Sequence, residues 1–320
     1  PLLSPAGADL PAYRDDFEHY ERWRALASDD AALADFVERV LRASDGAAAY
    51  RSYVGAPRLA RLRGPAPTAA TPAGRVTTPA DALIVAGARQ LAARARATGA
   101  QVLIAGIGQA FFAARLAQLQ LAAAGHRLRV MVETGLYDLD CGPDGHGYLL
   151  AYENMTRARR VSGIDDILGA LVDHRCLAAL GAAQLDRAGN LNSTWLASRE
   201  PTGTWLVGSG GACDIAASAA EVVVITRLAP GRLVERVDHI TSSGRAVRSI
   251  VTDRGTLERG DGDAWRLASV SDPTAAAAFA RDCPWPITDA APEVSAAITD
   301  REAQLLTQLD PTGTYRHRAG

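Results

Sequence analysis

The chain has 320 residues, of which 48% are apolar and 22% charged, and its formal net charge at pH 7 is −2. This length allows one large α/β domain, or one domain with an appendage. The near-neutral charge gives no electrostatic reason to expect a nucleic acid partner. The sequence contains no lysine, so a lysine Schiff base or a P-loop lysine in this chain is excluded.

The cysteines lie far apart and form no CxxC pair; they are Cys141, Cys176, Cys213 and Cys283. We therefore expect no metal site and no redox pair, and a reducing cytoplasmic location fits best. No signal peptide is expected, because the first residues lack a basic segment followed by an apolar one. No membrane span of about 20 apolar residues is expected either, because arginines interrupt the most apolar stretch, near residues 82–110.

The first segment, residues 1–54, is rich in charged and aromatic residues. Apolar residues recur there with the spacing of an amphipathic helix, at Leu33, Phe36, Val37, Val40 and Leu41. Ser28, Asp29 or Asp30 is expected to cap its start. The apolar stripe either packs on this chain or binds a partner, and both interpretations stay open.

Proline and glycine are frequent in residues 55–80, as is typical of a linker. We predict a helical extension with this Pro/Ala-rich linker over residues 1–75, and an α/β domain over residues 76–320. The domain begins with a helix that starts at Thr78-Pro79-Ala80-Asp81, continues to about Ala97 and ends at Gly99.

The next elements alternate between strands and helices. We expect a strand at 101–105, a Gly106-Ile107-Gly108 turn, a helix at about 110–124 and a strand at 128–132. This order is typical of a parallel sheet. Further on we expect a helix at 164–172, a strand at 176–180, a polar turn at 184–194, a helix at 213–220 and a strand at 221–226. The tail after about residue 261 is expected to combine Ala-rich helix with proline loops. The predicted fold is α/β, with an open, largely parallel sheet and flanking helices.

Glu133 is the first candidate for a catalytic residue. It ends the apolar run Val130-Met131-Val132, and Gly135 follows two residues later. Burying an unpaired carboxylate costs several kcal/mol, and open α/β sheets bind ligands at the edge where strands end. Taken alone, however, Glu133 is more simply explained as part of a structural ion pair.

Three further features each have a structural explanation as well. The polar turn at 186–194 is consistent with an ordinary hairpin, and the glycines at 208–211 with close packing of the backbone. Gly106-x-Gly108 is a weak dinucleotide signal, because the third glycine is missing. The acidic residue that would bind a ribose is missing too, unless Glu133 is that residue.

Together, and in this order, these features resemble the β subunit of a family I CoA-transferase, with glutaconate CoA-transferase closest in pattern. The resemblance runs from about Asp81 to Pro311. Its motifs are strand–Glu133–x–Gly135, Gly181–Thr194, Gly208–Ala212, Arg232–Gly244, Val251–Gly255 and Leu309–Pro311.

The resemblance implies that Glu133 is the catalytic glutamate. In the family mechanism, the carboxylate attacks an acyl-CoA, forms a mixed anhydride and then a glutamyl-CoA thioester, and a second carboxylic acid reverses these steps. Coenzyme A is a substrate, and no tightly bound cofactor is implied. Glycine-rich turns can offer backbone N–H donors to the oxyanion. The implied residues of the CoA and acyl site are Gly106, Gly108, Gly208, Ser209, Gly210, Gly211, Ala212, Asn190 and Asn192.

The resemblance also implies an α-type partner subunit, with the active site at the interface. Only one half of the family pattern is present, and 320 residues are too few for both halves plus the extension. We therefore expect a hetero-oligomer that acts on an acyl-CoA and a carboxylic acid.

Several departures from the family pattern surround the presumed acyl pocket and leave the acid substrate open. They are Gln109-Ala110, Leu206-Val207, Cys213-Asp214 and Thr241-Ser242-Ser243-Gly244. One alternative keeps the fold but opens a cyclic acyl-CoA by hydrolysis, as in actinobacterial relatives, with the glutamate as general base on water. A second alternative is a non-catalytic subunit of a biosynthetic complex. His146, Glu153 and Arg157 follow Glu133 in what is expected to be a Gly/Asp-rich loop (Asp138–Gly147), and they either contact substrate or are solvated loop residues.

Overall fold

The computed structural model describes residues 25, 28–45, 48–49, 52, 78–139, 152–173, 175–197, 203–260, 264–311 and 313. The chain divides into two units, one of residues 1–68 and 150–157 and the other of residues 69–149 and 158–320. Most of the expected linker lies outside the described residues, and so does His146. The expected domain boundary at residue 75 stays a prediction.

The smaller unit contains the amphipathic helix expected near Leu33. Helix α3 (Asp30–Phe36) is capped by Asp29, whose side chain accepts hydrogen bonds from the next turn. The helix continues as the π-helix η1 (Val37–Leu41) rather than as a regular α-helix. The same unit holds α8 (Tyr152–Arg157), so the expectation that Glu153 and Arg157 lie in a loop is wrong.

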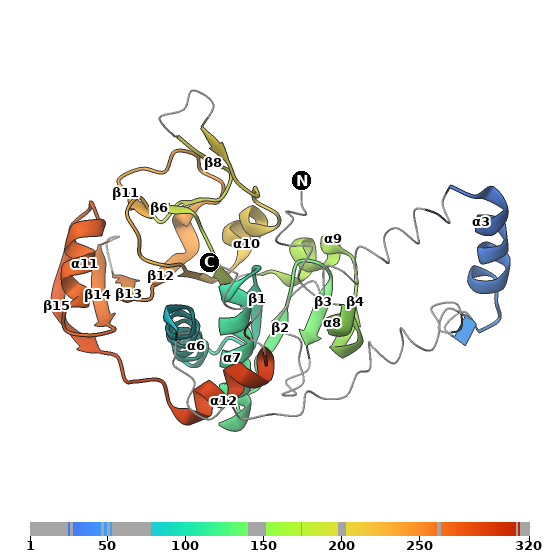
Figure 1. The fold of residues 1–320 in the computed structure, drawn as a ribbon, viewed down its shortest axis with the longest axis horizontal. Helices are drawn as coiled ribbons and strands as arrows, with labels where there is room; N and C mark the ends of the chain where they lie inside the picture. The colour runs from blue at the N-terminus through green and yellow to red at the C-terminus, as the bar shows by residue number, and fades with distance from the viewer. Residues whose placement is uncertain are drawn as a thin grey trace. The chain divides into compact units, whose positions relative to one another are not determined.

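Eight strands form the main sheet of the larger unit, in the order β15-β14-β13-β12-β10-β5-β1-β2 (Figure 1). Five of the seven neighbouring pairs are parallel, and only β12–β13 and β13–β14 are antiparallel. The predicted open, largely parallel sheet is therefore confirmed. The strands are β1 (Val102–Ala105), β2 (Arg129–Met131), β5 (Cys176–Leu180), β10 (Glu221–Ile225), β12 (Val247–Val251), β13 (Gly255–Arg259), β14 (Trp265–Val270) and β15 (Ile287–Val294).

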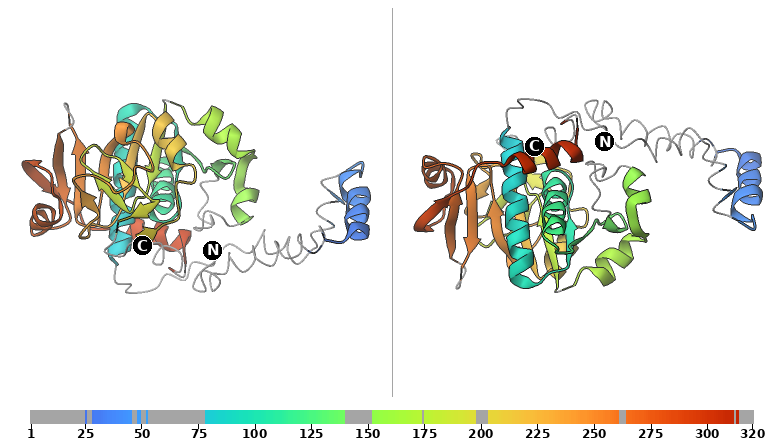
Figure 2. Two further views of the ribbon diagram at one scale, coloured as in Figure 1. Left: turned by 90° about the horizontal axis from the view of Figure 1, so that it is seen from above. Right: turned by 90° about the horizontal axis from the view of Figure 1, so that it is seen from below.

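Helices cover both faces of this sheet. On one face, α6 (Pro79–Thr98) and α7 (Gln109–Ala123) run side by side (Figure 2), and Gly87 of α6 lies against Ile225 of β10. The neighbouring Val224 belongs instead to the buried cluster that contains Ile215 of α10 (Ala212–Ser218). Because successive strand residues point to opposite faces, α6 and α10 lie on opposite sides of the sheet.

Helix α6 begins and ends where the sequence predicts. Thr78 and Asp81 form a reciprocal capping box at its start, with Pro79 in the first turn. Gly99 ends it in the left-handed conformation, at φ +69°. These local signals satisfy backbone groups that would otherwise lack partners at the helix ends.

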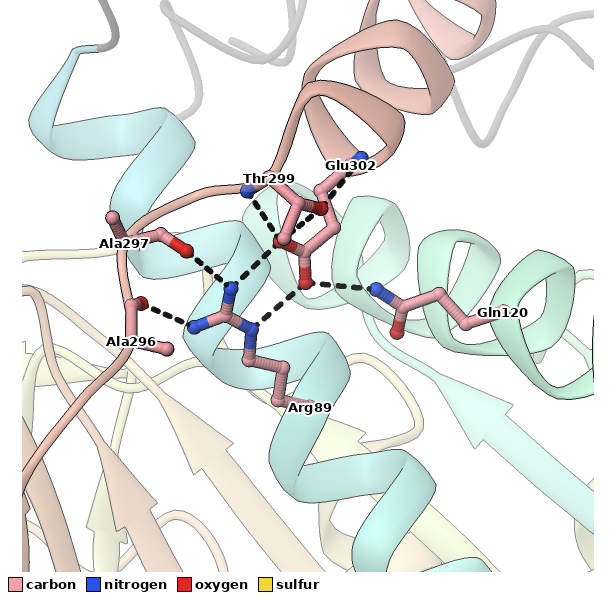
Figure 3. A network of polar contacts seen from close by, with 6 residues as sticks. All are labelled: Arg89, Gln120, Ala296, Ala297, Thr299 and Glu302. Carbon is pink, nitrogen blue, oxygen red and sulfur yellow. Dashed lines mark hydrogen bonds and ion pairs between the residues drawn. The ribbon is translucent and has the colours of Figure 1, made fainter.

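A polar network fastens the C-terminal helix α12 (Asp300–Leu309) to α6 and α7 (Figure 3). The Arg89 guanidinium donates to both oxygens of Glu302, at 2.8 and 2.7 Å. It also donates to the carbonyls of Ala296 and Ala297, and Gln120 donates to Glu302 as well. Burial opposes ionisation of Glu302, but the hydrogen bonds from Arg89 and Thr299 outweigh it and lower the pKa of the carboxyl.

The tail is more strand-rich than the sequence predicts. Besides α11 (Ala275–Asp282) and α12, it contains the strands β14 and β15. Three smaller sheets complete the unit: β3 (Leu136–Leu139) with β4 (Ala158–Val161), β8 (Trp195–Leu196) with β9 (Thr204–Trp205), and β6 (Gln184–Asp186) with β7 (Leu191–Asn192) and β11 (Leu233–Val234). The remaining elements are α9 (Ile164–Asp166), η2 (Ile167–Leu171) and η3 (Gly244–Ala246). Among the described residues, no helix is both long and apolar enough to cross a bilayer.

Candidate functional site

Glu133 lies just past the carboxyl end of β2, in a tight turn. The Val132 N–H donates to the Leu136 carbonyl, and the Gly135 N–H donates back to the Val132 carbonyl at 3.2 Å. Gly135 has φ +103°, and a Cβ there would lie 1.9 Å from the Ser162 carbonyl oxygen. Only glycine fits both this conformation and this approach. The glycine two residues after Glu133 therefore fixes the turn that carries the carboxylate.

The Glu133 carboxylate is held by the backbone of the glycine cluster. The Gly211 N–H donates to Glu133 Oε2 at 2.7 Å. A Cβ on Gly211 would lie 2.4 Å from the same oxygen, and a Cβ on Gly210 would lie 3.1 Å from Oε1. The backbone reaches the carboxylate this closely because neither residue has a side chain. Residues 133 and 211, which are 78 positions apart, are thus brought together as one site.

The fold also explains why the carboxylate points toward this loop. Met131 of β2 lies in the same buried cluster as Ile215 of α10. Glu133 follows Met131 by two residues, in the turn directly after β2. Gly211 is the residue immediately before α10. The strand and the helix therefore bring the carboxylate and its N–H donor together on one face of the sheet.

The glycine cluster is anchored on the polar turn that precedes it in the chain. The Gly208 N–H donates to the Ser193 carbonyl at 2.8 Å, and the Ser193 hydroxyl donates to the Gly208 carbonyl at 2.9 Å. The Leu206 N–H likewise donates to the Thr194 carbonyl. Gly208 and Gly210 have φ +90° and +49°, which glycine adopts most readily.

Asn190 and Asn192 organise this polar turn. Asn192 is fully buried, and its amide group bonds Gln184 and the Trp195 carbonyl. Asn190 donates to Asp186 at 3.1 Å and accepts from the Gly244 N–H at 3.0 Å. These contacts give both side chains a structural part in holding the turn. Direct contact of either one with coenzyme A stays a prediction.

A Cβ on Gly244 would lie 2.1 Å from the Gly189 carbonyl carbon. The last residue of the Thr241–Gly244 motif therefore packs directly against the polar turn. This contact joins the Thr241–Gly244 motif to the polar turn. It is not a contact with the Glu133 carboxylate.

The Gly106–Gly108 turn follows β1, which pairs in parallel with β2. The Gly106 N–H donates to the Ala179 carbonyl at 2.8 Å. Gly108, at φ +84°, caps the start of α7. Both glycines therefore lie at the same end of the sheet as Glu133, where the strands have their carboxyl ends, and β1 is the direct neighbour of β2.

Two residues at the site were not singled out from the sequence. The Cβ position of Gly211 lies 3.0 Å from Leu168 Cδ1, so this side chain of η2 also borders the loop that holds Glu133. Ser162 packs its carbonyl on Gly135. Both contacts join distant segments, so the sequence has no local signal for them.

The remaining residues of the expected site lie around the start of α10. The Ala212 N–H donates to the Ser209 carbonyl, which closes the glycine loop into the helix. The Ser209 hydroxyl donates to the Gly210 carbonyl at 3.0 Å. The partly exposed Cys213 lies in the first turn of α10, with its thiol 3.7 Å from the Ser209 hydroxyl. In the described part of the chain, no group of three or more His, Cys, Asp or Glu side chains is arranged to hold a metal ion.

Comparisons with known proteins bear on the fold rather than on the site residues. No protein-family model matches the chain. A segment of 65 residues is 43% identical to one of the subunits of 3-oxoadipate CoA-transferase from Pseudomonas knackmussii. The match covers 20% of this chain and only a quarter of the length of that relative.

Solved structures cover far more of the chain. Glutaconate coenzyme A-transferase from Acidaminococcus fermentans superposes with a TM-score of 0.64 at 21% identity, over 75% of this chain and 97% of that one. Rhodococcus jostii RHA1 IpdAB gives a TM-score of 0.60 at 19% identity, over 77% and 99%. The decarboxylase AibA/AibB gives 0.59 at 22% identity, over 76% and 98%. The larger unit of this chain thus has the family I CoA-transferase fold.

Proposed function

We propose that the chain is the β-type subunit of a CoA-transferase, with Glu133 as its covalent nucleophile. The observation that carries this proposal is the 2.7 Å hydrogen bond from the Gly211 N–H to Glu133 Oε2. The carboxylate lies so close to Gly210 and Gly211 that a side chain at either position would collide with it. A merely structural ion pair would place a basic side chain on Glu133. Within the described residues, none makes a salt bridge with it.

One carboxylate oxygen is held while the other is available for reaction. A hydrogen bond from a backbone N–H to a charged acceptor contributes about 1.5–3 kcal/mol, and it fixes the orientation of the group. Oε1 accepts no hydrogen bond from any described residue. A carboxylate oxygen that accepts no hydrogen bond keeps its lone pairs for attack on an electrophile, which is what covalent catalysis by a carboxylate requires.

The reaction then follows the sequence of steps that the resemblance implies. A Glu133 oxygen attacks the thioester carbonyl carbon, the carbon–sulfur bond breaks and the CoA thiolate leaves, giving a mixed anhydride. The thiolate attacks the Glu133 carbonyl of that anhydride, and the first carboxylate departs from a glutamyl-CoA thioester. A second carboxylate attacks this thioester, and the same steps in reverse release the new acyl-CoA and restore Glu133.

Backbone donors at the edge of the sheet support the negative charge that develops in these steps. The glycine turns at 106–108 and 208–211 both lie at this edge. We propose that they line the site for coenzyme A and the acyl group, with Ser209 and Ala212 beside them. Coenzyme A is a substrate in this proposal and is not a resident cofactor.

We propose an α-type subunit as the partner of this chain. The relatives support a heteromer, because one is a single subunit of a CoA-transferase and another is the pair AibA/AibB. The identity of the acyl donor and of the acceptor acid stays open, because the departures from the family pattern lie close to the glycine loop.

Hydrolysis is the second candidate function, and the free Oε1 oxygen favours it as well. The same oxygen could remove a proton from water instead of attacking a carbonyl. The two reactions differ in whether turnover needs a second carboxylic acid. Incubation in 18O-water without an acceptor acid decides between them, since label in the released acid at the full turnover rate favours hydrolysis.

The first test of the proposal is turnover by the complex of this chain with its partner. Glu133→Gln should lower kcat for CoA transfer by about 1,000-fold or more, because the nucleophile is lost. Glu293→Gln provides a matched control, since Glu293 is exposed on β15 at the opposite end of the sheet. Unchanged activity in Glu133→Gln would favour the non-catalytic alternative.

A further inference from the structure

Two arginines lie beside the carboxyl ends of other strands of the main sheet, in the segment between β10 and β11. Arg227 follows β10 by two residues. The Arg232 guanidinium donates to the carbonyls of Ala182 and Ala183, both at 2.9 Å, and these two residues follow β5. Because β10 and β5 are parallel neighbours, both arginines lie at the carboxyl ends of the central strands.

This pair carries positive charge that no described side chain balances. No described carboxylate lies within salt-bridge distance of Arg227 or Arg232. Arg232 is partly buried, and its Nε atom is buried without a hydrogen-bond partner. Burial first, and then the charge of Arg227, lower the pKa of Arg232. Both effects disfavour the charged form of Arg232 in the folded chain.

Two other partly buried arginines of the larger unit are paired with carboxylates. Arg89 makes two hydrogen bonds to the carboxylate of Glu302, and Arg94 makes two to Glu221. These two arginines therefore have a carboxylate partner within the fold. The pair at 227 and 232 differs, since neither arginine makes an ion pair with a described carboxylate, and the exposed Arg227 side chain makes no hydrogen bond to a described residue.

The spacing of the strands suggests which anion fits. Strand β10 is three strands from β2 in the sheet, which corresponds to about 14 Å at roughly 4.8 Å per strand. In coenzyme A, about 13 bonds separate the sulfur from the diphosphate, and this arm spans about 16 Å when extended. If the sulfur of coenzyme A lies at Glu133, its diphosphate would therefore lie close to the carboxyl end of β10.

We propose that Arg227 and Arg232 bind the diphosphate of coenzyme A while its sulfur reacts at Glu133. The inference rests on the proposed function and extends it to a second part of the site. The guanidinium fork matches the geometry of phosphate oxygens and stays charged at neutral pH. The arginines would then anchor the nucleotide half of the substrate, and the glycine turns would receive the pantetheine arm.

The test compares the binding of coenzyme A with that of pantetheine, which lacks the diphosphate and the nucleotide. Calorimetry on the full chain with its partner subunit gives both dissociation constants. Arg227→Ala is the informative variant, because Arg227 is exposed and makes no hydrogen bond to the described chain. Its Kd for coenzyme A should rise about tenfold or more, while its Kd for pantetheine stays at the wild-type value.

Arg248→Ala is the matched control for the loss of one positive charge. Arg248 is exposed at the second residue of β12, away from the carboxyl edge, and its replacement should leave both constants unchanged. Equal coenzyme A binding by the Arg227 and Arg248 variants would overturn the inference while leaving the proposed function intact. Weakened binding of inorganic diphosphate without weakened binding of coenzyme A would overturn it too. A wild-type complex that binds neither coenzyme A nor pantetheine would contradict the proposed function itself.

Discussion

Replacing Gly211 by alanine tests whether the glycine backbone holds the Glu133 carboxylate. The new Cβ would lie 2.4 Å from Oε2 and 3.0 Å from Leu168 Cδ1. An ordinary contact needs about 3.5 Å, so the carboxylate must move by about 1 Å. The backbone of residue 211 is not strained by this change, because its φ of −82° suits alanine. The perturbation therefore acts on the position of Glu133.

The size of the effect follows from the lost contact. The hydrogen bond from the Gly211 N–H contributes about 1.5–3 kcal/mol, which corresponds to roughly 10- to 150-fold in rate. A 1 Å displacement of a reacting group alone costs about 100-fold. We expect Gly211→Ala to slow formation of the covalent adduct by about 100-fold. Its free energy of unfolding should change by only about 1 kcal/mol or less.

Rapid-quench measurement of CoA release in the first turnover is the appropriate assay. Gly169→Ala is the matched control, because a Cβ at this glycine of η2 meets nothing within 4 Å. A Gly211→Ala enzyme that reacts as fast as wild type would refute the geometry described above.

The remaining predictions concern the turn behind Glu133 and the anchor of the C-terminal helix. Gly135→Ala should destabilise the fold by about 3 kcal/mol or more in urea unfolding, because φ is +103° and Cβ would lie 1.9 Å from the Ser162 carbonyl oxygen; a loss below 1 kcal/mol would contradict this packing. Glu302→Gln should cost about 3 kcal/mol at pH 7, because Arg89 loses its charged partner. The folded-state pKa of Glu302 is lowered from 4.5, so its contribution is complete above that pH and is lost as the pH falls through the lower folded value. A stability difference between wild type and Glu302→Gln that stays constant down to pH 2 would show that ionisation of Glu302 is not its source.

The sequence predicts the elements around the site well where local signals are strong. Thr78, Asp81 and Gly99 define the ends of α6, and the capping chemistry alone predicts both. The β1–α7–β2 unit is equally visible, because apolar strands alternate with a helix that ends near Gly125. These elements place Glu133 at the end of a strand before any tertiary contact is known.

The antiparallel extension of the sheet is less visible in the sequence. In β14, buried Trp265 and Leu267 flank exposed Arg266, but the run is short and then becomes irregular. Strand β15 contains Pro292, and Ala291 adopts φ +31°. Proline within an apolar run argues against a strand. A parallel partner and a register shift nevertheless accommodate both residues.

The two π-helical turns could not be predicted either. Periodicity favours one continuous helix through Leu41 and another through Val172, whereas each becomes a π-helix in its second half. In both cases the first residue after the turn bonds the carbonyl five residues back. An apolar stripe has nearly the same spacing in both helix types, so the pattern does not distinguish them.

The contact that defines the candidate site is a tertiary one. Glu133 and Gly211 are each conspicuous in the sequence, yet only the folded sheet brings the carboxylate to the N–H of the loop. Asn190 and Asn192 show the opposite case. Their amide groups make hydrogen bonds inside the turn that supports the loop, a role that the sequence pattern does not separate from ligand binding.

The central claim is that Glu133 forms a covalent adduct with coenzyme A, and peptide mass analysis tests it most directly. The complex of this chain with its partner is incubated with an acyl-CoA and then reduced with borohydride, which converts a glutamyl thioester to a primary alcohol. We expect the reduced residue at position 133 in wild type and its loss in Glu133→Gln. With active partner and substrate present, an unmodified Glu133, or a modified carboxylate elsewhere in the chain, would contradict the account.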